Sequence, residues 1–473
     1  MTKFYLTAAI PYVNAKPHIG HALEFVQGDA IARYHRLLGD ETIYLTGSDE
    51  NALKNVQAAE KAGQDVREFC KIHADEFVAL AKKLSVQFDV FQRSSSEEHH
   101  VSSQELWKLC AKNGNIYKKT YEGLYCVGCE AFYTPDELNE NGECFEHPGK
   151  KLEKVGEENY FFKLSSYKDK ILQLIKSGQL EIIPEKQKNE VIRFLQGDVQ
   201  DISISRSKER ARNWGVQVPG DPTQIMYVWF DALNVYQSGV GFGIDEKRYK
   251  KWWPADVHLI GKGIIRFHAV YWPAMLLSAG LPLPKHIYSH GYITVNGQKM
   301  SKTLGNVIDP IEIIEKYGVE PIRYYLLREI PTTEDGDISV DRVGEMYSSA
   351  LANELGNLVS RLAKLCEGSS ITTVTIKTFS PAVSHSINRF ALREALDDIW
   401  NRISAFNKRI SDEKVWEKKG DDRLKTLNEL VAGIIAVGYD LQPFLPETAK
   451  RILSIFTAKT ITQPAPLFPR LSA

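Results

Sequence analysis

The sequence predicts an α/β fold, in which a Rossmann-like parallel sheet is split by a zinc-knuckle insertion and followed by a C-terminal α-helical bundle. Three observations predict it. Strand and helix patterns alternate over the first 50 residues, as in a parallel sheet with crossover helices. A segment rich in Gly, Tyr, Cys and Pro interrupts the chain near residue 118, and long amphipathic patterns with few strands begin near residue 342.

The composition limits the class of protein and the number of domains only broadly. The 473 residues, 43% hydrophobic and 25% charged, are typical of a globular protein of two or three domains. The net charge of −1 means that a nucleic-acid partner would be met by local basic patches. Six cysteines do not form a disulfide framework in a chain of this length, and no run approaches about 18 apolar residues or has the features of a signal peptide. We therefore expect a cytoplasmic protein with no membrane partner.

The first unit is a strand, a turn and a helix. Residues 3–9 are a short apolar strand, and residues 18–38 have a helical pattern that ends at Gly39. A glycine-containing turn before a helix forms an anion site, because free backbone N–H groups and the helix dipole point to one place. His18 and His21 share one face of the first helical turn, either at this site or as packed or capping histidines.

The second strand, residues 42–46, is followed by Gly47, Ser48 and Asp49. This is the carboxyl end of the strand, where open α/β sheets bind ligands. Asp49 is either an acceptor for a substrate ammonium group or the N-cap of the next helix.

The segment Lys299–Asn306 has two lysines three residues apart, flanked by hydroxyl groups and followed by Gly-Asn. Such a loop can close over a polyphosphate, because its ammonium groups and hydroxyl donors suit phosphate oxygens. The alternative is a solvated surface turn.

The inserted segment carries the pattern Cys-x2-Cys-x14-Cys-x2-His. This spacing is typical of a closed tetrahedral zinc site that stabilises the fold and leaves no position for substrate. The alternative is a set of structural cysteines without metal. The ligands would be Cys126, Cys129, Cys144 and His147. The basic run at residues 206–212 is either an RNA contact or a solvated surface.

His18-Ile19-Gly20-His21 at a helix start, with Lys299-Met300-Ser301-Lys302-Thr303 far downstream, resembles the two signature motifs of the class I aminoacyl-tRNA synthetases. Residues 9–12, 229–236 and 267–275 resemble the methionyl-tRNA synthetases within that class, and the resemblance spans essentially the whole chain. It implies activation of methionine by ATP, giving methionyl-adenylate and pyrophosphate. Transfer to the 3′ end of tRNA(Met) follows, for initiation and elongation of translation.

The resemblance also implies residue roles. Catalytic residues would be His18, His21, Lys299 and Lys302, and ATP, arriving with Mg²⁺, would be bound by His18, Gly20, His21, Gly261, Lys299, Ser301 and Lys302. Methionine would be bound by Ile10, Tyr12, Asp49, Trp229, Ala232, Tyr236, Ile264 and His268. Aromatic residues at such spacing are otherwise core. A thioether gains from aromatic contacts and from one polar group near sulfur, so the chemistry suits the set.

Two departures from the family stand near these residues. Asn51-Ala52-Leu53-Lys54 replaces the common His-Gly, and Gly263 stands where relatives usually have an acidic residue that meets the ribose. Either another group takes over the latter role, or ATP binds more weakly.

Asn353, Asn357 and Arg361 recur every fourth residue and form one stripe on a helix, with Trp416 expected on a later helix. Amides, a guanidinium and an indole suit single-stranded bases, whereas the alternative is a solvent face and a core tryptophan. By resemblance they read the anticodon CAU.

We expect a monomer with a divided catalytic domain. Its parts would be residues 1–117 and 222–290, with the insertion at 118–221, the lysine loop and stem-contact region at 291–345, and the anticodon-binding domain at 346–473. Two other hypotheses are a different class I synthetase, with the cysteinyl enzymes nearest in size, and an RNA-binding paralogue without catalysis.

Overall fold

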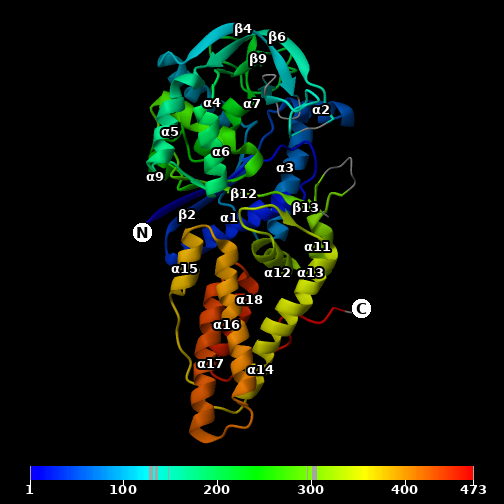
Figure 1. Cartoon of the computed structure of the whole chain (residues 1–473), viewed down its shortest axis with the longest axis vertical. Coiled ribbons are helices and arrows are strands. Elements are labelled where there is room, and N and C mark those ends of the chain that lie inside the picture. The colour runs from blue at the N-terminus through cyan, green and yellow to red at the C-terminus, as the bar shows by residue number, and fades with distance from the viewer. Residues whose placement is uncertain are drawn as a thin grey trace.

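A parallel six-stranded sheet forms the centre of the computed structural model, which describes residues 2–126, 131–133, 137–146, 149–295, 297–300 and 306–471 (Figure 1). The strand order is β3-β2-β1-β11-β12-β7, with every neighbouring pair parallel. The strands are β1 (Lys3–Ala8), β2 (Glu41–Ser48), β3 (Val90–Arg93), β7 (Glu181–Ile183), β11 (Val257–Gly261) and β12 (His286–His290). The predicted Rossmann-like sheet is thus confirmed.

The order of the strands reverses between β1 and β11. The chain moves outward from β1 to β2 and β3 on one side, and β11, β12 and β7 extend the sheet on the other. Helices that follow strands on the two sides of such a point leave a crevice at the carboxyl ends of the strands, where ligands bind. Residues just after β1 and β11 therefore have the best position for a site.

Helices cover both faces of the sheet. One face packs against α1 (Ile19–Leu38) and α3 (Val66–Lys83), and the other packs against α4, α7, α8 and α10. The last four of these are α4 (Glu97–Lys112), α7 (Val228–Ala232), α8 (Val235–Ser238) and α10 (Trp272–Ala279). The other helices around the sheet are α2 (Leu53–Ala62), α5 (Lys168–Lys176), α6 (Glu185–Gln196), α9 (Glu246–Trp252), α11 (Pro310–Tyr317) and α12 (Val319–Tyr324). Helix α1 ends as expected at Gly39, whose φ of 87° is the left-handed conformation that glycine adopts at low cost.

A second, antiparallel sheet lies at one end of the molecule, near the top of Figure 1. Its strands are β4 (Ile116–Cys126), β5 (Ala131–Tyr133), β6 (Glu153–Phe162) and β8 (Ile202–Ser203), and β9 (Ser205–Ser207) pairs with β10 (Gln224–Met226) beside it. The expected insertion at 118–221 does not stay outside the main sheet, because β7 within it pairs with β12 as the edge strand. The chain therefore leaves the sheet, returns for three residues and leaves again.

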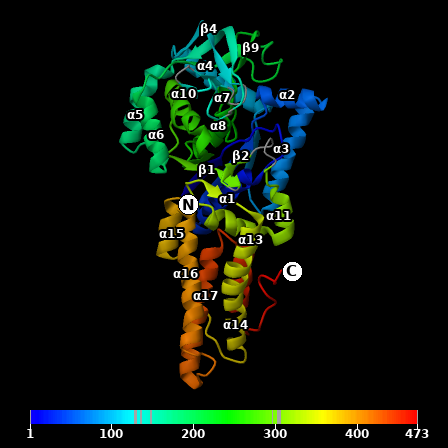
Figure 2. The ribbon, with the colours of Figure 1, turned by 45° about the vertical axis from the view of Figure 1, so that its right-hand side comes forward.

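The C-terminal part is helical, as predicted, and extends away from the sheet in Figures 1 and 2. Its helices are α13 (Val340–Met346), α14 (Asn357–Cys366), α15 (Pro381–Asn388), α16 (Leu392–Asp412), α17 (Gly420–Leu441) and α18 (Pro446–Phe456), and a π-helical segment (Tyr347–Gly356) joins α13 to α14. Short strands β13 (Ile293–Val295), β14 (Gln298–Lys299) and β15 (Gly336–Asp337) lie between the sheet and the helices. One hydrophobic core runs from α1 into these helices. Among the residues that the structure describes, no helix is long and apolar enough to cross a membrane.

Candidate active site

The two histidines lie at the start of α1 and cap it. His18 is the N-cap residue, and its Nδ1 accepts from the backbone N–H of Gly20 at 3.1 Å. The Nδ1 of His21 accepts from the backbone N–H of His18 at 3.1 Å, and the two rings stack with centroids 3.9 Å apart. Because each Nδ1 accepts, each neutral ring carries its proton on Nε2, as a hydrogen-bond donor. Capping and a place at the predicted anion site are therefore compatible.

Burial holds His21 in its neutral form. Its pKa lies well below the usual value, first because the ring is desolvated and then because positive charge on His18 or His290 would oppose its own. A neutral His21 offers hydrogen bonding through Nε2 and no net charge.

A cavity of about 620 Å³ opens at the carboxyl ends of β1 and β11. It brings together two groups of predicted residues that are far apart in the sequence, the nucleotide group and the methionine group. Its lining includes Ile10, Tyr12, His18, His21, Trp229, Gly261 and Ile264 of the predicted residues. The volume and the mixed lining suit a small apolar side chain joined to a nucleotide.

The apolar wall of the cavity is built from stacked rings. Trp229 stacks on Phe267 with centroids 3.8 Å apart, and its edge faces Tyr12 at 6.4 Å. Ala232 is buried one turn after Trp229 on α7. His268, on the π-helical turn Phe267–Tyr271, has its ring 6.4 Å from that of Trp229.

Behind this wall, Tyr236 and His268 form a buried polar pair. His268 Nδ1 lies 3.0 Å from the carbonyl oxygen of Ile264, which can only accept, so Nδ1 carries the proton. His268 Nε2 then accepts from the hydroxyl of Tyr236 at 2.7 Å. Burial lowers the pKa of His268 to about 4 and raises that of Tyr236 well above its usual value, so both groups are neutral near pH 7.

Asp49 lies beside Tyr12 and is not the N-cap of the next helix. Residues 12 and 49 form a parallel β-bridge, and the backbone N–H of Asp49 donates to the carbonyl of Pro11 at 2.8 Å. Helix α2 starts at Leu53 with Ala52 as its N-cap, so the capping alternative for Asp49 is wrong. Asp49 is 2% exposed and adjoins the apolar wall of the cavity through Tyr12.

The space beside Gly263 is filled by Tyr292. A Cβ atom at position 263 would collide with the Tyr292 hydroxyl, which donates to Glu146 Oε2 at 3.3 Å. The same carboxylate oxygen lies 3.7 Å from that Cβ position. A tyrosine and a carboxylate from elsewhere in the chain therefore occupy the region where the resemblance led us to expect an acidic side chain at position 263.

The lysine loop is only partly described. The backbone of Lys299 pairs with Thr294 in the β13–β14 hairpin, and Met300 lines the cavity. Ser301 and Lys302, with Thr303, lie outside the described residues, as does the side chain of Lys299. The start of the loop is thus at the cavity, next to the histidines.

Two of the four expected zinc ligands lie together. Cys126, at the end of β4, and Cys144 are both buried, and their sulfur atoms are 3.2 Å apart. This distance is far above the length of about 2.05 Å of a disulfide bond. Cys129 and His147 lie outside the described residues, and within those residues no group of three or more candidate ligands occurs. Two buried thiols facing each other fit half of the predicted site.

The predicted anticodon residues share one surface. Asn353 and Asn357 are exposed, and Arg361 donates to Ser411 Oγ at 3.0 Å. The Arg361 guanidinium lies 5.1 Å from the ring centroid of Trp416. Trp416 is 46% exposed, so the alternative of a core tryptophan is wrong. It lies in the turn between α16 and α17, so its expected position on a helix is also wrong.

The basic run at 206–212 is largely engaged within the protein. Arg206 is buried, with its guanidinium 5.5 Å from the rings of both Tyr125 and Tyr227. Arg210 lies 4.7 Å from the Tyr125 ring and 3.4 Å from a carboxylate oxygen of Glu153. Arg206 therefore connects the insertion to Tyr227, just before α7, whereas the contacts of Arg210 lie within the insertion.

Several cavity residues were not predicted. Glu24 lines the cavity and its Oε2 lies 3.0 Å from His290 Nε2, while Tyr292 and Met300 also contribute. The helical period carried a signal for Glu24, which lies three residues after His21 on the same face. Tyr292 shows no such local signal, because its position depends on β12 lying next to β11.

A parallel sheet with a nucleotide-sized cavity at its switch point and a histidine-capped helix start defines a nucleotide-binding enzyme of the class I synthetase kind. A family model described as "tRNA synthetases class I (M)" matches residues 4–363, and the chain belongs to this family.

Similar proteins agree with this assignment. The chain is 41% identical to a methionine--tRNA ligase of Thermotoga maritima over 95% of this chain and 74% of that protein. It is 39% identical to one of Brucella melitensis over 96% and 92%. The solved structure of Mycobacterium tuberculosis methionyl-tRNA synthetase in complex with methionyl-adenylate has a TM-score of 0.91 and 36% identity, covering 99% of this chain and 100% of that one.

Proposed function

We propose that this chain is a methionine:tRNA ligase. It activates L-methionine with ATP, forming methionyl-adenylate and diphosphate, and transfers the methionyl group to the 3′ end of tRNA(Met) for initiation and elongation of translation. The observation that carries the proposal is the cavity in which His18 and His21 face the same space as Tyr12, Trp229 and Ile264.

The first half-reaction requires positioning more than proton transfer. The methionine carboxylate attacks the α-phosphorus of ATP and diphosphate leaves, so negative charge builds on phosphate oxygens. In our proposal His18 and His21 donate hydrogen bonds from Nε2 to these oxygens, and Gly20 and Gly261 let the nucleotide approach the backbone. Lys299, Ser301 and Lys302 close over the leaving group, with Lys302 nearest the reacting phosphates. Mg²⁺ enters with ATP and neutralises phosphate charge.

Methionine is held at both ends. Asp49 accepts from the ammonium group, and the side chain lies among Ile10, Tyr12, Trp229, Ala232 and Ile264. His268, fixed by Tyr236, supplies the polar group near sulfur. The low pKa of His268 supports this role, because a neutral ring can lie beside a thioether without the cost of a buried charge.

One zinc ion stabilises the insertion in our proposal, bound by Cys126, Cys129, Cys144 and His147. The buried sulfur pair of Cys126 and Cys144 supports it. Bound there, zinc supplies cross-linking of two chain segments and no chemistry at the substrate. Metal analysis of the purified protein is expected to find one zinc per chain, and its absence from active protein would disprove the site.

Anticodon recognition belongs to the far end of the helical part. Asn353, Asn357, Arg361 and Trp416 contact the CAU bases, and the proximity of Arg361 to Trp416 supports a joint surface. We further propose a monomer that acts in the cytoplasm, which sedimentation and cell fractionation would test.

Methionine-dependent exchange of pyrophosphate into ATP tests the activity. Methionine should stimulate exchange and cysteine should not, and purified tRNA(Met) should then be charged. Stimulation by cysteine would favour the cysteinyl alternative. A chain that binds tRNA without any exchange would be the non-catalytic paralogue.

A further inference from the structure

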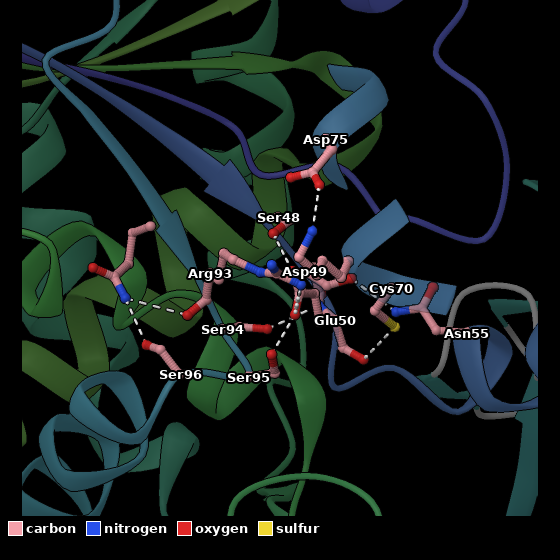
Figure 3. A network of polar contacts seen from close by, with 12 residues as sticks. Ser48, Asp49, Glu50, Asn55, Cys70, Asp75, Arg93, Ser94, Ser95 and Ser96 are labelled. Atoms are coloured by element: carbon pink, nitrogen blue, oxygen red, sulfur yellow. Dashed lines mark hydrogen bonds and ion pairs between the residues drawn. The ribbon is translucent and has the colours of Figure 1, made fainter. Parts of the chain in front are cut away.

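Glu50, the neighbour of Asp49, is a fully buried carboxylate. Arg93 donates to it from Nε at 2.7 Å and from Nη2 at 3.2 Å, and Ser48 Oγ donates at 2.6 Å. The Ser95 hydroxyl also donates to it (Figure 3). A buried charge is costly unless it is paired and hydrogen-bonded, and this one has both kinds of partner.

The donors come from the ends of two adjacent strands. Ser48 ends β2 and Arg93 ends β3, and the two are register partners in the parallel ladder. The Glu50 carboxylate therefore joins β2 and β3 at the edge of the sheet where the cavity opens.

The backbone around Glu50 is equally constrained. Its N–H donates to Ser94 Oγ at 2.8 Å, and its carbonyl accepts from Trp214 Nε1 at 2.7 Å. On the other side, the N–H of Asp49 donates to the Pro11 carbonyl, and the Asp49 carbonyl accepts from Asn55 Nδ2 at 2.8 Å. Both peptide groups that flank the Cα of Asp49 are thus held from outside.

We propose that Glu50, held by Arg93, is the positioning residue that sets the Asp49 carboxylate for the substrate ammonium group. Successive residues of extended chain point to opposite sides, so Glu50 anchors the strand from behind while Asp49 stays beside Tyr12. Loss of the anchor lets residue 49 shift, and a shift of about 1 Å in a substrate contact can cost roughly 100-fold. This inference rests on the proposed function, because it concerns the same methionine site.

The test is Glu50→Gln, which keeps the size of the side chain and removes its charge. Methionine-dependent exchange should show a KM for methionine raised by about 10- to 100-fold, with the KM for ATP within twofold of the original value. Binding of methioninol, which keeps the ammonium group and lacks the carboxylate, should weaken in parallel. An unchanged KM for methionine in folded protein would overturn the proposal.

A matched control is the pair Asp440 and Arg402 in the helical part. Asp440 is 1% exposed and Arg402 is 27% exposed, against 0% and 29% for Glu50 and Arg93, and Arg402 Nη2 lies 2.7 Å from Asp440. Asp440→Asn should lower thermal stability and leave both KM values unchanged. If Asp440→Asn raises the KM for methionine as much as Glu50→Gln does, Glu50 has only a structural role.

A double-mutant cycle isolates the link to Asp49. Adding Glu50→Gln to Asp49→Asn should change methionine affinity little beyond Asp49→Asn alone, because the anchored carboxylate is already gone. Additive effects of the two substitutions on methionine affinity would overturn the proposal.

If Glu50→Gln does not fold, Ser48→Ala is the alternative variant, because it removes one hydrogen-bond donor to Glu50. It should raise the KM for methionine by a smaller factor, and an unchanged KM for methionine in this variant would also overturn the proposal. Absence of methionine-dependent exchange in the unaltered chain would instead refute the proposed function.

Discussion

At the residue scale, the pair Tyr236 and His268 shows how hydrogen bonding determines a side chain's chemistry. The Ile264 carbonyl fixes the proton on His268 Nδ1, so Nε2 needs a donor, and the Tyr236 hydroxyl is that donor. Tyr236 is itself held, since Tyr5 donates to its carbonyl at 2.5 Å. The orientation of the His268 ring is therefore determined by groups that need not touch substrate.

Tyr236→Phe should raise the KM for methionine by about 2- to 10-fold with little change in kcat, because one buried hydrogen bond contributes about 0.5–1.5 kcal/mol. Pyrophosphate exchange measures both constants. Tyr249→Phe is the control, since Tyr249 lies in the same hydrophobic cluster and donates at 2.5 Å to Gln237, not to His268. Equal effects of the two substitutions would contradict a specific role for Tyr236.

At the element scale, the sequence predicted the bounds of helices and strands that depend on neighbouring residues. The bounds of β1 and α1 follow the apolar period and the capping residues, and each agrees with the structure to within two residues at either end. The resemblance to the class I synthetases, and not a local pattern, placed the histidines and the start of the lysine loop at one cavity.

Elements fixed by distant contacts were not predicted. The strand β7 has three residues and exists because it pairs with β12, about 100 residues later, which leaves no periodic signal in its own sequence. Tyr292 and Glu146 meet beside Gly263 for the same reason, because their segments come together only in the folded chain. The Asp49 alternatives were equally compatible with the sequence until the start of α2 was known.

The loop between α16 and α17 carries Trp416, and substitution of this residue should affect only the reaction with tRNA. Trp416→Ala should lower kcat/KM for tRNA(Met) by about 5- to 150-fold, since stacking on one base contributes about 1–3 kcal/mol, and should leave methionine-dependent exchange unchanged. Helix α16 has 21 residues and spans about 30 Å, which separates this loop from the sheet. Aminoacylation and exchange assays give the two values.

Two further variants sharpen that experiment. Trp416→Phe should restore most of the tRNA affinity, because a ring still stacks. Ile244→Ala alters a side chain of similar exposure, 50% against 46%, elsewhere on the surface and should change neither assay. An equal loss in exchange and aminoacylation for Trp416→Ala would remove the anticodon role.

At the scale of the whole molecule, one buried arginine joins α1 to the C-terminal helical part. Arg323 is fully buried and pairs with Asp29 of α1 at 2.8 Å. It also donates to the carbonyls of Leu84, Pro443 and Phe444 at 3.1, 3.2 and 2.8 Å. Asp29 accepts in addition from Arg33 at 2.7 Å. Helix α1, which has His18 as its N-cap, is thus connected through Arg323 of α12 to the turn between α17 and α18, consistent with the shared core.

Burial of neutral histidines on both sides of the sheet predicts acid sensitivity. The pKa of His99 is lowered to about 3 and that of His268 to about 4, while those of His21 and His258 lie well below the usual value, in each case first through desolvation. Unfolding restores a pKa near 6.5, so between the two values the unfolded chain binds more protons. Stability is therefore fully present above about pH 6.5 and falls as the pH decreases toward 5, by up to about 1.4 kcal/mol per pH unit for each histidine.

Urea unfolding at pH 5.0, 5.5, 6.0, 6.5 and 7.5 measures this slope, in a range where most carboxylates keep their charge. His99→Gln is the informative variant, because His99 contacts Ser238 and Ser103 at 2.9 and 3.1 Å through groups that an amide can replace. Removing this one titration should make the loss of unfolding free energy between pH 6.5 and 5.0 smaller by about 2 kcal/mol. An identical pH dependence in both proteins would mean that His99 is protonated without cost in the folded state, and the desolvation argument would fail for the other three histidines as well.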